Sequence, residues 1–493
     1  MEKETIIVKG MTLSANGKKL IAVSPFFDGI IPEGVEEICD GVFEHSHFES
    51  ITLPSTTKII GEGAFASANI SEINLPEGLL SIGKGAFSFT EIKEISFPGS
   101  LRTIPQEAFS YSSINKVCIH DGVEIIEKEA FSYCDELQIV ELPESLKEIH
   151  EGAFFVDNAL TEASLPANLE LVGDNAFCWC PELHFKDELP RSLRHIGDGA
   201  FYCCKFDVPF ILHDGIEHIG GGAFVYADIQ FDVQTDKYET EDNILYTSGK
   251  YKTISMYGTP DVVSVNARTR VIGEKTFCQA ESLKEVALPE GLIHIENEAF
   301  KWDKELKEIH FPKSLKSIGD MAFFDTGLLN VTVTEEVENF TLAFANTRIA
   351  EATILCKKVS NNAFFACGEL LSMTFGKETT DIGESSFEQC SALRELKLPE
   401  GIKIIQDRAF QGCNNLKKVV LPSTLTSMGA ESFAYCDSLE EVFVNGSPKE
   451  WNGFAFIGSE CLKEVHIKEE MRERLINESK TKDPKFIEKL TIH

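Results

Sequence analysis

Apolar and polar residues follow one another along most of this chain in a recurring order. The segment 137–154 reads LQIVELPESLKEIHEGAF. Its first six residues, L-x-x-V-x-L, predict a strand whose apolar side chains point to one side and whose Glu141 points to the other. Pro143 ends this strand because it has no N–H to donate to a sheet. Leu146 and Ile149 continue the apolar pattern up to a closing Ala-Phe pair, so the segment predicts one folded unit with a single apolar face.

The closing Phe recurs in two series, and Ala precedes it in most copies. Successive copies within a series are 20 to 24 residues apart. One such unit cannot bury its apolar face alone, so neighbouring units must stack and share a continuous core. The sequence therefore predicts a solenoid. We call these positions the repeat Phe residues; they are Phe43, Phe65, Phe87, Phe109, Phe131, Phe154, Phe177, Phe201, Phe224, Phe277, Phe300, Phe323, Phe344, Phe364, Phe387, Phe410 and Phe433.

The consensus of these units, L-P-x-[GS]-L-x-x-I-G-x-x-A-F, resembles the BspA-type leucine-rich-repeat family over nearly the whole chain. We therefore expect a leucine-rich-repeat solenoid: a curved right-handed superhelix with one continuous parallel β-sheet on its concave side, mostly short turns and strands elsewhere, and two β-hairpin elements. The resemblance also implies cell-surface or secreted proteins with roles in adhesion and protein recognition.

The turn that follows each strand departs from the usual leucine-rich repeat. Its Asn or Cys position is Asn168 in one copy and Gly, Ser or Thr in most others, so we expect a different pattern of turn hydrogen bonds. The residues at this position include Gly34, Thr56, Ser145, Ser192, Gly291, Ser314, Gly401 and Thr424.

The register of the repeat breaks once, between Phe224 and Phe277. Two β-prone runs around Ser248-Gly249-Lys250 predict a hairpin in this gap, and Asn16-Gly17 predicts another near the start of the chain. We therefore expect five segments. They are an N-terminal hairpin cap with the first rung (1–42), a first repeat array (43–230), a hairpin-containing insertion (231–276), a second array (277–444), and a C-terminal cap containing Trp451 with a charged tail (445–493).

Charge and composition narrow the range of partners. Hydrophobic residues make up 43% of the 493 residues, and 79 acidic residues against 46 basic ones give a net charge of −33. Such a chain repels a phosphate backbone, so we expect no nucleic-acid partner. No apolar run approaches the ~20 residues of a spanning helix, so we expect no membrane insertion.

The start, MEKETIIVKG, lacks the pattern of a signal peptide, which predicts a cytoplasmic protein. The alternative, implied by the family resemblance, is secretion or the cell surface.

Fourteen Cys residues raise the question of a metal or disulfide site. Seven of them lie three residues after a repeat Phe, where other copies carry Ala, Ser or Thr. This spacing favours a buried slot for a small side chain over a zinc site, whose ligands must converge on one point. We expect free, reduced thiols there. These seven are Cys134, Cys180, Cys204, Cys367, Cys390, Cys413 and Cys436.

No catalytic motif is present in the sequence. The twelve His residues form no H-E-x-x-H pattern, and there is no G-x-S-x-G elbow, Walker loop or G-x-G-x-x-G after a strand. We therefore expect a non-enzymatic protein without cofactor or metal, whose work is to bind another macromolecule.

The predicted strand face supplies the candidate binding residues. Its outward position before the central apolar residue is often Glu, as in Glu285, Glu308 and Glu395, with Lys one residue earlier in several copies. These charges either form a solvated face or recognise a basic partner or bridging cations. Outward apolar residues are better anchors for an interface, and they are Ile139, Val420 and Phe443. Val420 and Phe443 occupy the same position in consecutive copies, so we expect them side by side.

Two kinds of ligand fit such a face. A protein ligand is favoured, and a cell-surface carbohydrate is the alternative. Sugar sites usually present exposed aromatic platforms, yet the chain has only three Trp residues, Trp179, Trp302 and Trp451. The last of these is expected to cover the final rung.

Overall fold

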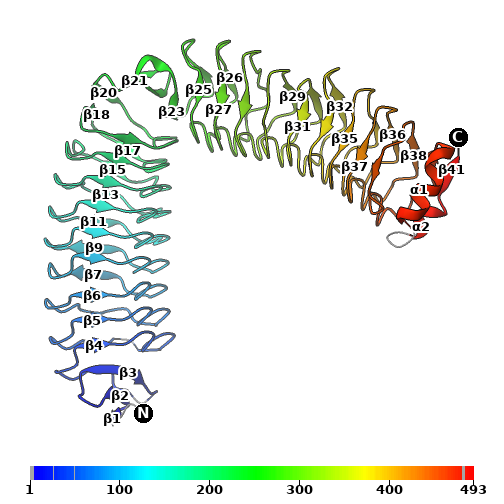
Figure 1. Ribbon diagram of the computed structural model, residues 1–493. Coiled ribbons are helices and arrows are strands. Elements are labelled where there is room, and N and C mark those ends of the chain that lie inside the picture. Colours follow the sequence, from blue (N-terminus) through cyan, green and yellow to red (C-terminus); the bar gives the residue numbers. More distant parts are fainter. Residues whose placement is uncertain (1–4, 26, 49, 480–483, 493) are drawn as a thin grey trace. The chain divides into compact units, whose positions relative to one another are not determined.

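The chain forms a parallel β-solenoid of about 19 turns (Figure 1), which confirms the predicted fold class. The computed structural model describes residues 5–25, 27–48, 50–479 and 484–492. These residues divide into two compact units: unit 1 comprises Met1–Thr240 with Ser255–Gly258, and unit 2 comprises Glu241–Ile254 with Thr259–His493.

Most coils contribute two strands, which we call the long strand and the short strand. In the coil 137–154 the L-x-x-V-x-L segment gives β11 (Ile139–Glu141), and the following apolar pair gives β12 (Glu148–Ile149). Ile149 of β12 is aligned with Ile126 and Val172 of the neighbouring coils, and every such pair runs parallel. The exact repetition of the sequence pattern therefore becomes an exact register between coils.

In unit 1 an N-terminal sheet contains β1 (Thr5–Val8), β2 (Met11–Ser14), β3 (Lys19–Val23), β4 (Glu37–Ile38), β5 (Ile59–Ile60) and β6 (Ser81–Ile82). The short strands continue as β8 (Thr103–Ile104), β10 (Ile125–Ile126), β12, β14 (Leu171–Val172), β16 (His195–Ile196) and β19 (His218–Ile219). The long strands are β7 (Glu94–Phe97), β9 (Lys116–Ile119), β11 and β13 (Glu162–Ala163), then β15 (His184–Phe185) with β17 (Lys205–Phe206), and β18 (Phe210–His213) with β20 (Phe231–Gln234).

At the junction in the chain lie β21 (Tyr238–Glu241), β22 (Ile244–Thr247), a 3-10 turn (Ser248–Lys250) and β23 (Thr253–Met256). In unit 2 the short strands are β25 (Val271–Ile272), β27 (His294–Ile295) and β28 (Ser317–Ile318), then β31 (Lys358–Val359), β33 (Asp381–Ile382), β35 (Ile404–Ile405), β37 (Ser427–Met428) and β39 (Glu450–Trp451). The long strands are β24 (Val262–Ser264), β26 (Glu285–Ala287), β29 (Asn330–Val333), β30 (Glu351–Ile354), β32 (Ser372–Phe375), β34 (Glu395–Lys397), β36 (Lys418–Leu421), β38 (Glu441–Val444) and β40 (Glu464–Ile467). The chain ends in α1 (Glu469–Ser479), α2 (Pro484–Ile487) and β41 (Leu490–Ile492).

The arrangement of strands differs from the expected single continuous sheet. Two separate ladders run along each unit, and both are broken into segments of two to six strands. The repeat strands are only two to four residues long, so the loss of one or two hydrogen bonds at a coil is enough to interrupt a ladder. These interruptions shape the candidate site described below.

The repeat Phe residues form the centre of the core. Their rings are fully buried and stack face to face from coil to coil; Phe43 and Phe65, for example, have centroids 4.8 Å apart and planes 8° apart. The stack in unit 2 continues one coil beyond the predicted series, because Phe456 lies 5.5 Å from Phe433. The Ala-Phe pair at 455–456 was the sequence signal for this further copy.

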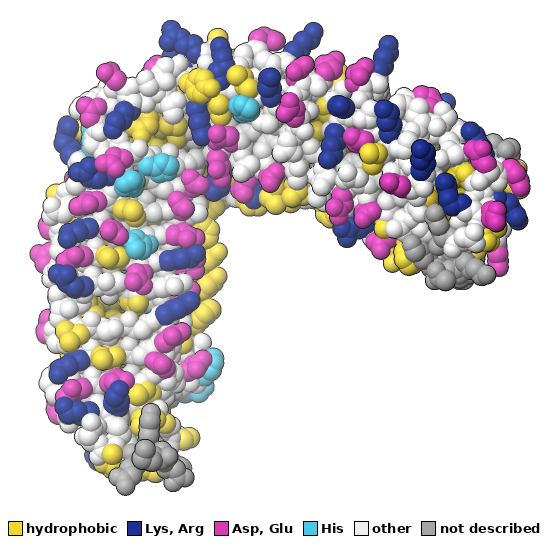
Figure 2. Space-filling view, viewed as in Figure 1, with side chains coloured by type: hydrophobic (Ala, Val, Ile, Leu, Met, Phe, Trp, Pro, Cys, Tyr) yellow, Lys and Arg dark blue, Asp and Glu magenta, His cyan; other side chains and the backbone are white. Residues whose placement is uncertain are grey.

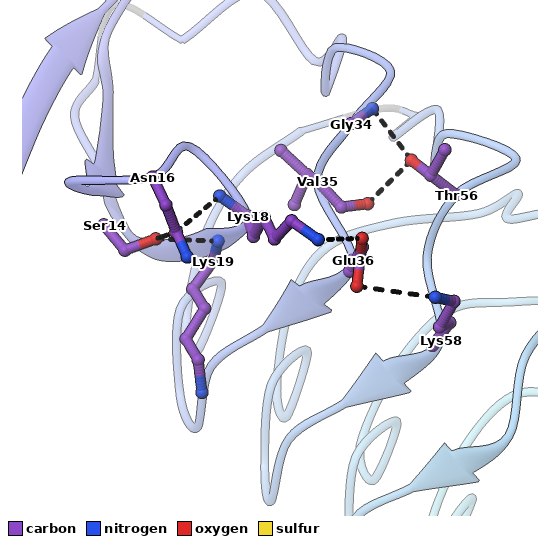
Figure 3. Close-up of polar contacts among 9 residues, drawn as sticks. All are labelled: Ser14, Asn16, Lys18, Lys19, Gly34, Val35, Glu36, Thr56 and Lys58. Atoms are coloured by element: carbon purple, nitrogen blue, oxygen red, sulfur yellow. Dashed lines mark hydrogen bonds and ion pairs between the residues drawn. The ribbon is translucent and has the colours of Figure 1, made fainter.

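Hydroxyl groups replace the Asn of the usual leucine-rich-repeat turn, as Figure 3 shows for one pair of coils. Thr56 Oγ1 donates to the carbonyl of Val35 at 2.9 Å and accepts the N–H of Gly34 at 2.9 Å. Each hydroxyl thus satisfies a donor and an acceptor of the preceding turn, which otherwise lack partners. Ser145 and Thr424 make the same pair of bonds in their coils.

Both predicted hairpin regions form. β1, β2 and β3 are antiparallel, with the turn at Asn16-Gly17, and β3 then pairs in parallel with β4, so the hairpin leads into the first coil. Strands β22 and β23 are hydrogen-bonded neighbours joined by the turn Ser248–Lys250.

At the other end, Trp451 lies in the ladder itself, as part of β39. It is buried and packs against Phe456 and against Phe486 of α2, with centroids 5.9 and 6.2 Å apart. Phe486 stacks face to face on Phe456, with centroids 5.7 Å apart and planes 8° apart, so Phe486 ends the Phe stack, whereas Trp451 contacts Phe456 at a tilt.

Candidate functional site

The outward side chains of the long strands form the candidate surface. Glu395, Lys418, Glu441 and Glu464 are aligned across β34, β36, β38 and β40, and Lys418 lies 3.4 Å from Glu441. Figure 2 shows basic and acidic side chains interspersed on the visible face of both units. An exposed ion pair contributes only about 0–1 kcal/mol, so this column of charges, which includes Glu395, adds little to the stability of the fold.

The second outward column contains the apolar pair. Val420 and Phe443 are register partners, so they lie side by side as predicted. The Phe443 ring stacks on His466 of the following coil, with centroids 4.3 Å apart and planes 8° apart. From the preceding coil, Lys418 Nζ lies 4.6 Å from the Phe443 centroid. Phe443 is therefore half-buried and held by its neighbours, which fixes its orientation and leaves less of the ring free for a ligand.

Glu285 and Glu308 line one groove of unit 2, with a volume of about 460 Å³. It opens where the ladder is interrupted: β26 pairs with β24, but the segment 307–311 of the next coil forms no strand. The lysines that precede each Glu, Lys284 and Lys307, line it too. Glu308 lies 3.3 Å from His310, whereas Glu285 has no ion pair within the described part of the chain. The groove therefore presents both signs of charge, with a carboxylate open to a partner.

A second groove of about 460 Å³ lies in unit 1, and sequence reasoning did not find it. It too borders an interrupted ladder, between the segment 73–75 and β7. Glu94, Lys116 and Glu141 line it, and Lys116 holds Glu141 at 2.8 Å. Hydrogen bonding to Lys116 lowers the pKa of Glu141, so this carboxylate stays charged.

Ile139 lies beside this second groove. It is half-buried in β11 and aligned with Lys116 on one side and Glu162 on the other. The structure thus separates the six predicted site residues. Ile139 is in unit 1, Glu285 and Glu308 share a groove in unit 2, and Glu395, Val420 and Phe443 lie further along unit 2.

Cys and Thr side chains in the Cys slot, three residues after a repeat Phe, donate hydrogen bonds to backbone carbonyls. Cys180 Sγ, for instance, donates to the carbonyl of Phe154 in the preceding coil at 3.0 Å, and Thr90 fills the same slot by donating to Phe87 at 2.8 Å. Burial raises the pKa of the Cys180 thiol well above its usual range, so the reactive thiolate is disfavoured. All seven predicted slot cysteines are free and buried, whereas Cys461, outside the slot, is exposed.

Among the residues that the structure describes, no group of three or more His, Cys, Asp or Glu side chains is placed to hold a metal ion. Neither described helix has both the length and the apolar character needed to cross a lipid bilayer.

The comparison with protein families identifies the type of repeat. A family model described as "BspA type Leucine rich repeat region (6 copies)" matches residues 26–138, 102–230, 261–369 and 357–475. A search of curated proteins found no match.

Several solved structures are similar over most of their length. A leucine-rich repeat protein from Bacteroides ovatus is 19% identical, with a TM-score of 0.33, over 89% of this chain and 92% of that one. A leucine rich cell surface protein from Faecalibacterium prausnitzii is 21% identical, with a TM-score of 0.33, over 89% and 94%. The pneumococcal vaccine antigen PcpA is 16% identical, with a TM-score of 0.31, over 99% and 97%.

Proposed function

The chain belongs to the BspA-type leucine-rich-repeat family, and from this premise we propose that it is a non-enzymatic scaffold that binds another protein on the outward side of its long strands. The observation that carries the proposal is the groove lined by Glu285 and Glu308, with its counterpart in unit 1. Solenoids bind partners along such extended surfaces, because neighbouring repeats supply a regular array of side chains.

The chemistry of the groove favours a folded or extended protein as the ligand. Lys284 and Lys307 alternate with Glu285 and Glu308 along its wall, so a partner must offer both signs of charge in a matching order. Such complementarity selects the partner and its orientation more than it adds affinity. The net charge of −33 disfavours a nucleic acid.

Capture from a lysate of the source cells tests this proposal. The full chain is compared with the double variant Glu285→Lys/Glu308→Lys, which reverses the groove charge. Glu378→Lys, an exposed residue outside the groove, is the matched control. We expect a specific protein that the wild type and the control retain and the double variant loses. Equal capture by all three proteins contradicts the assignment of the groove.

A carbohydrate is the alternative ligand. Binding to a glycan array that depends on Glu285 and Glu308, without any protein capture, favours it.

We propose the cytoplasm as the compartment, with secretion or the cell surface as the alternative. Fractionation of the source cells with an antibody against the chain decides between them.

A further inference from the structure

The residue two positions after each repeat Phe has a left-handed backbone in every coil. With Gly458 after Phe456 included, its φ lies between 55° and 76° across the two units, for example 59° at Tyr111 and 70° at Gly412. This conformation costs an L-residue with a bulky side chain about 1–2 kcal/mol, and Gly or Asn much less. Unit 2 fills the position mostly with residues that are not aromatic, among them Gln279, Asp325, Asn346, Gln389, Gly412 and Gly458. The fold therefore does not need aromatic side chains at this site.

Three consecutive coils of unit 1 nevertheless carry aromatic rings there. Phe89, Tyr111 and Tyr133 are 57%, 49% and 36% exposed. Phe89 stacks on Tyr111 with centroids 4.9 Å apart, and Tyr111 on Tyr133 with centroids 4.5 Å apart. We call these three residues the aromatic ladder. Figure 2 shows a column of hydrophobic side chains along one edge of unit 1.

Burial does not explain the choice of these side chains, because all three are exposed. Stacking between the rings stabilises the fold by about 0.5–1.5 kcal/mol per pair, which at best offsets the cost of the left-handed backbone. Exposed contiguous apolar surface on a soluble protein usually marks a contact site. The three ladder residues lie in the turns that follow the short strands. The grooves are lined by residues of the long strands, so the ladder and the grooves occupy different parts of each coil.

We propose that the aromatic ladder binds an extended, proline-rich and basic segment of another protein. A polyproline II helix has three residues and about 9.3 Å per turn. The two centroid distances of the ladder, 4.9 Å and 4.5 Å, add up to nearly this distance. Residues one turn apart in such a segment can therefore contact the first and the third ring of the ladder. The segment makes no internal hydrogen bonds, so its carbonyl groups are free to accept from the Tyr111 and Tyr133 hydroxyls.

The acidic side chains close to the ladder favour a basic segment as the ligand. Glu91 and Asp135 each follow a ladder residue by two positions and are exposed. Glu129 precedes Tyr133 by four positions and is close enough to help raise the pKa of the Tyr133 hydroxyl, after burial and Tyr111. Arginine or lysine between the prolines would approach these carboxylates. Aromatic-lined surfaces are a known mode of recognition for proline-rich segments.

The ring geometry disfavours two other occupants. A sugar stacks on the face of an aromatic ring, but here the facing sides of neighbouring rings cover one another, so mainly edges and hydroxyls point outward. A second copy of the chain carries the same net charge of −33, and self-association would bring like charges together.

Fluorescence anisotropy with the full chain tests the proposal. The probe is a labelled Arg-Pro-Pro repeat of about twelve residues, four turns of the helix. Glu-Pro-Pro and Arg-Gly-Ser repeats of equal length separate the effect of charge from that of conformation. Chitohexaose as a competitor tests for a glycan instead.

The variant is Tyr111→Asn/Tyr133→Asn, since Asn accepts the left-handed backbone and the fold should keep or gain stability. Gln389→Asn, at the same position of a unit 2 coil, is the matched control. We expect the wild type and the control to bind Arg-Pro-Pro, the ladder variant to bind at least ~10-fold more weakly, and both control peptides to bind poorly.

Three results overturn the proposal: no binding of Arg-Pro-Pro to the wild type, equal binding by the ladder variant, or displacement of the probe by chitohexaose. The proposal is also distinct from the function proposed for the grooves, because Glu285→Lys/Glu308→Lys should leave Arg-Pro-Pro binding unchanged.

Discussion

Asp157 occupies the buried slot three residues after Phe154, and its Oδ1 accepts the backbone N–H of Cys134 in the preceding coil at 2.8 Å. Its Oδ2 has no hydrogen-bond partner among the described residues, although the side chain is fully buried. Asp303 repeats this arrangement in unit 2, where it accepts the N–H of Ala280 at 2.7 Å. Since Cys, Ser and Thr act as donors in this slot, a protonated carboxyl fits it better than a carboxylate.

The first prediction concerns the pH dependence of stability. Burial raises the pKa of Asp157 well above its usual value, against the bond from Cys134, with Asp135 adding to the rise. The folded state therefore holds the proton more tightly than the unfolded state. The resulting stabilisation is complete below the unfolded pKa of about 3.9 and is lost as pH rises toward the folded pKa. Asp157→Asn, which is neutral at every pH, should remove this dependence.

Denaturant unfolding at pH 5.5 and pH 8 measures the effect. The wild type should lose stability relative to Asp157→Asn between these values, by at most about 1.4 kcal/mol per pH unit. Asp236→Asn, at an exposed position of unit 1, is the control and should leave the slope unchanged. Parallel pH profiles for the wild type and Asp157→Asn would show that the buried group is not protonated in the folded state. The groups facing Asp157 from the adjacent coils are Cys134 and Cys180, both with raised thiol pKa values.

The second prediction concerns the Phe stack. Phe131 lies between Phe109 and Phe154, with centroids 5.9 and 5.4 Å away. Phe131→Ala should cost about 3–5 kcal/mol, because deleting a buried aromatic ring leaves a cavity. The loss should be greatest in the coil of Phe131 and its neighbours, since solenoid contacts are between adjacent repeats. Hydrogen exchange should show faster exchange in residues 103–172 than in unit 2, and uniform exchange would contradict nearest-neighbour coupling.

The third prediction concerns thiol reactivity. Nine of the fourteen Cys residues are buried, whereas Cys461 is exposed. In native buffer Cys461 should react first with a thiol reagent, and the nine buried thiols should react only after unfolding, because burial blocks access to them. Burial also raises the thiol pKa of eight of them: Cys134, Cys180, Cys204, Cys356, Cys367, Cys390, Cys413 and Cys436. Mass spectrometry of labelled peptides with and without denaturant distinguishes these classes. Rapid native labelling of Cys390 or Cys413 would place the slot outside the core.

The fourth prediction compares an apolar anchor with a charge on the long-strand face. Phe443→Ala should weaken capture of the native partner at least ~10-fold, as loss of an aromatic anchor does. Loss of its stack on His466 should lower stability by no more than about 1.5 kcal/mol. Glu308→Lys reverses only one of the two groove carboxylates, so it should weaken capture less than Glu285→Lys/Glu308→Lys does. If Glu308→Lys weakens capture and Phe443→Ala does not, the apolar pair is not part of the interface and the groove alone binds the partner.

The sequence by itself determined the repeat, its register and the interior of the fold. A Phe every 20 to 24 residues requires stacking, because a single unit has no other surface against which to bury the ring. The same spacing predicted that Val420 and Phe443 lie side by side, since equal positions in consecutive coils must align. The Cys slot followed for the same reason, as its residues keep a constant distance from the repeat Phe.

Only the tertiary structure decided where the repeat surface is interrupted or specialised. Glu285 and Glu308 share a groove because the strand ladder is interrupted between their coils. The interruption depends on a few backbone hydrogen bonds, which no residue pattern indicates. Phe89, Tyr111 and Tyr133 look like core residues in the sequence, and it is the left-handed backbone that turns them outward. The partner of Asp157 likewise comes from the preceding coil, 23 residues away, where stacking alone sets the distance.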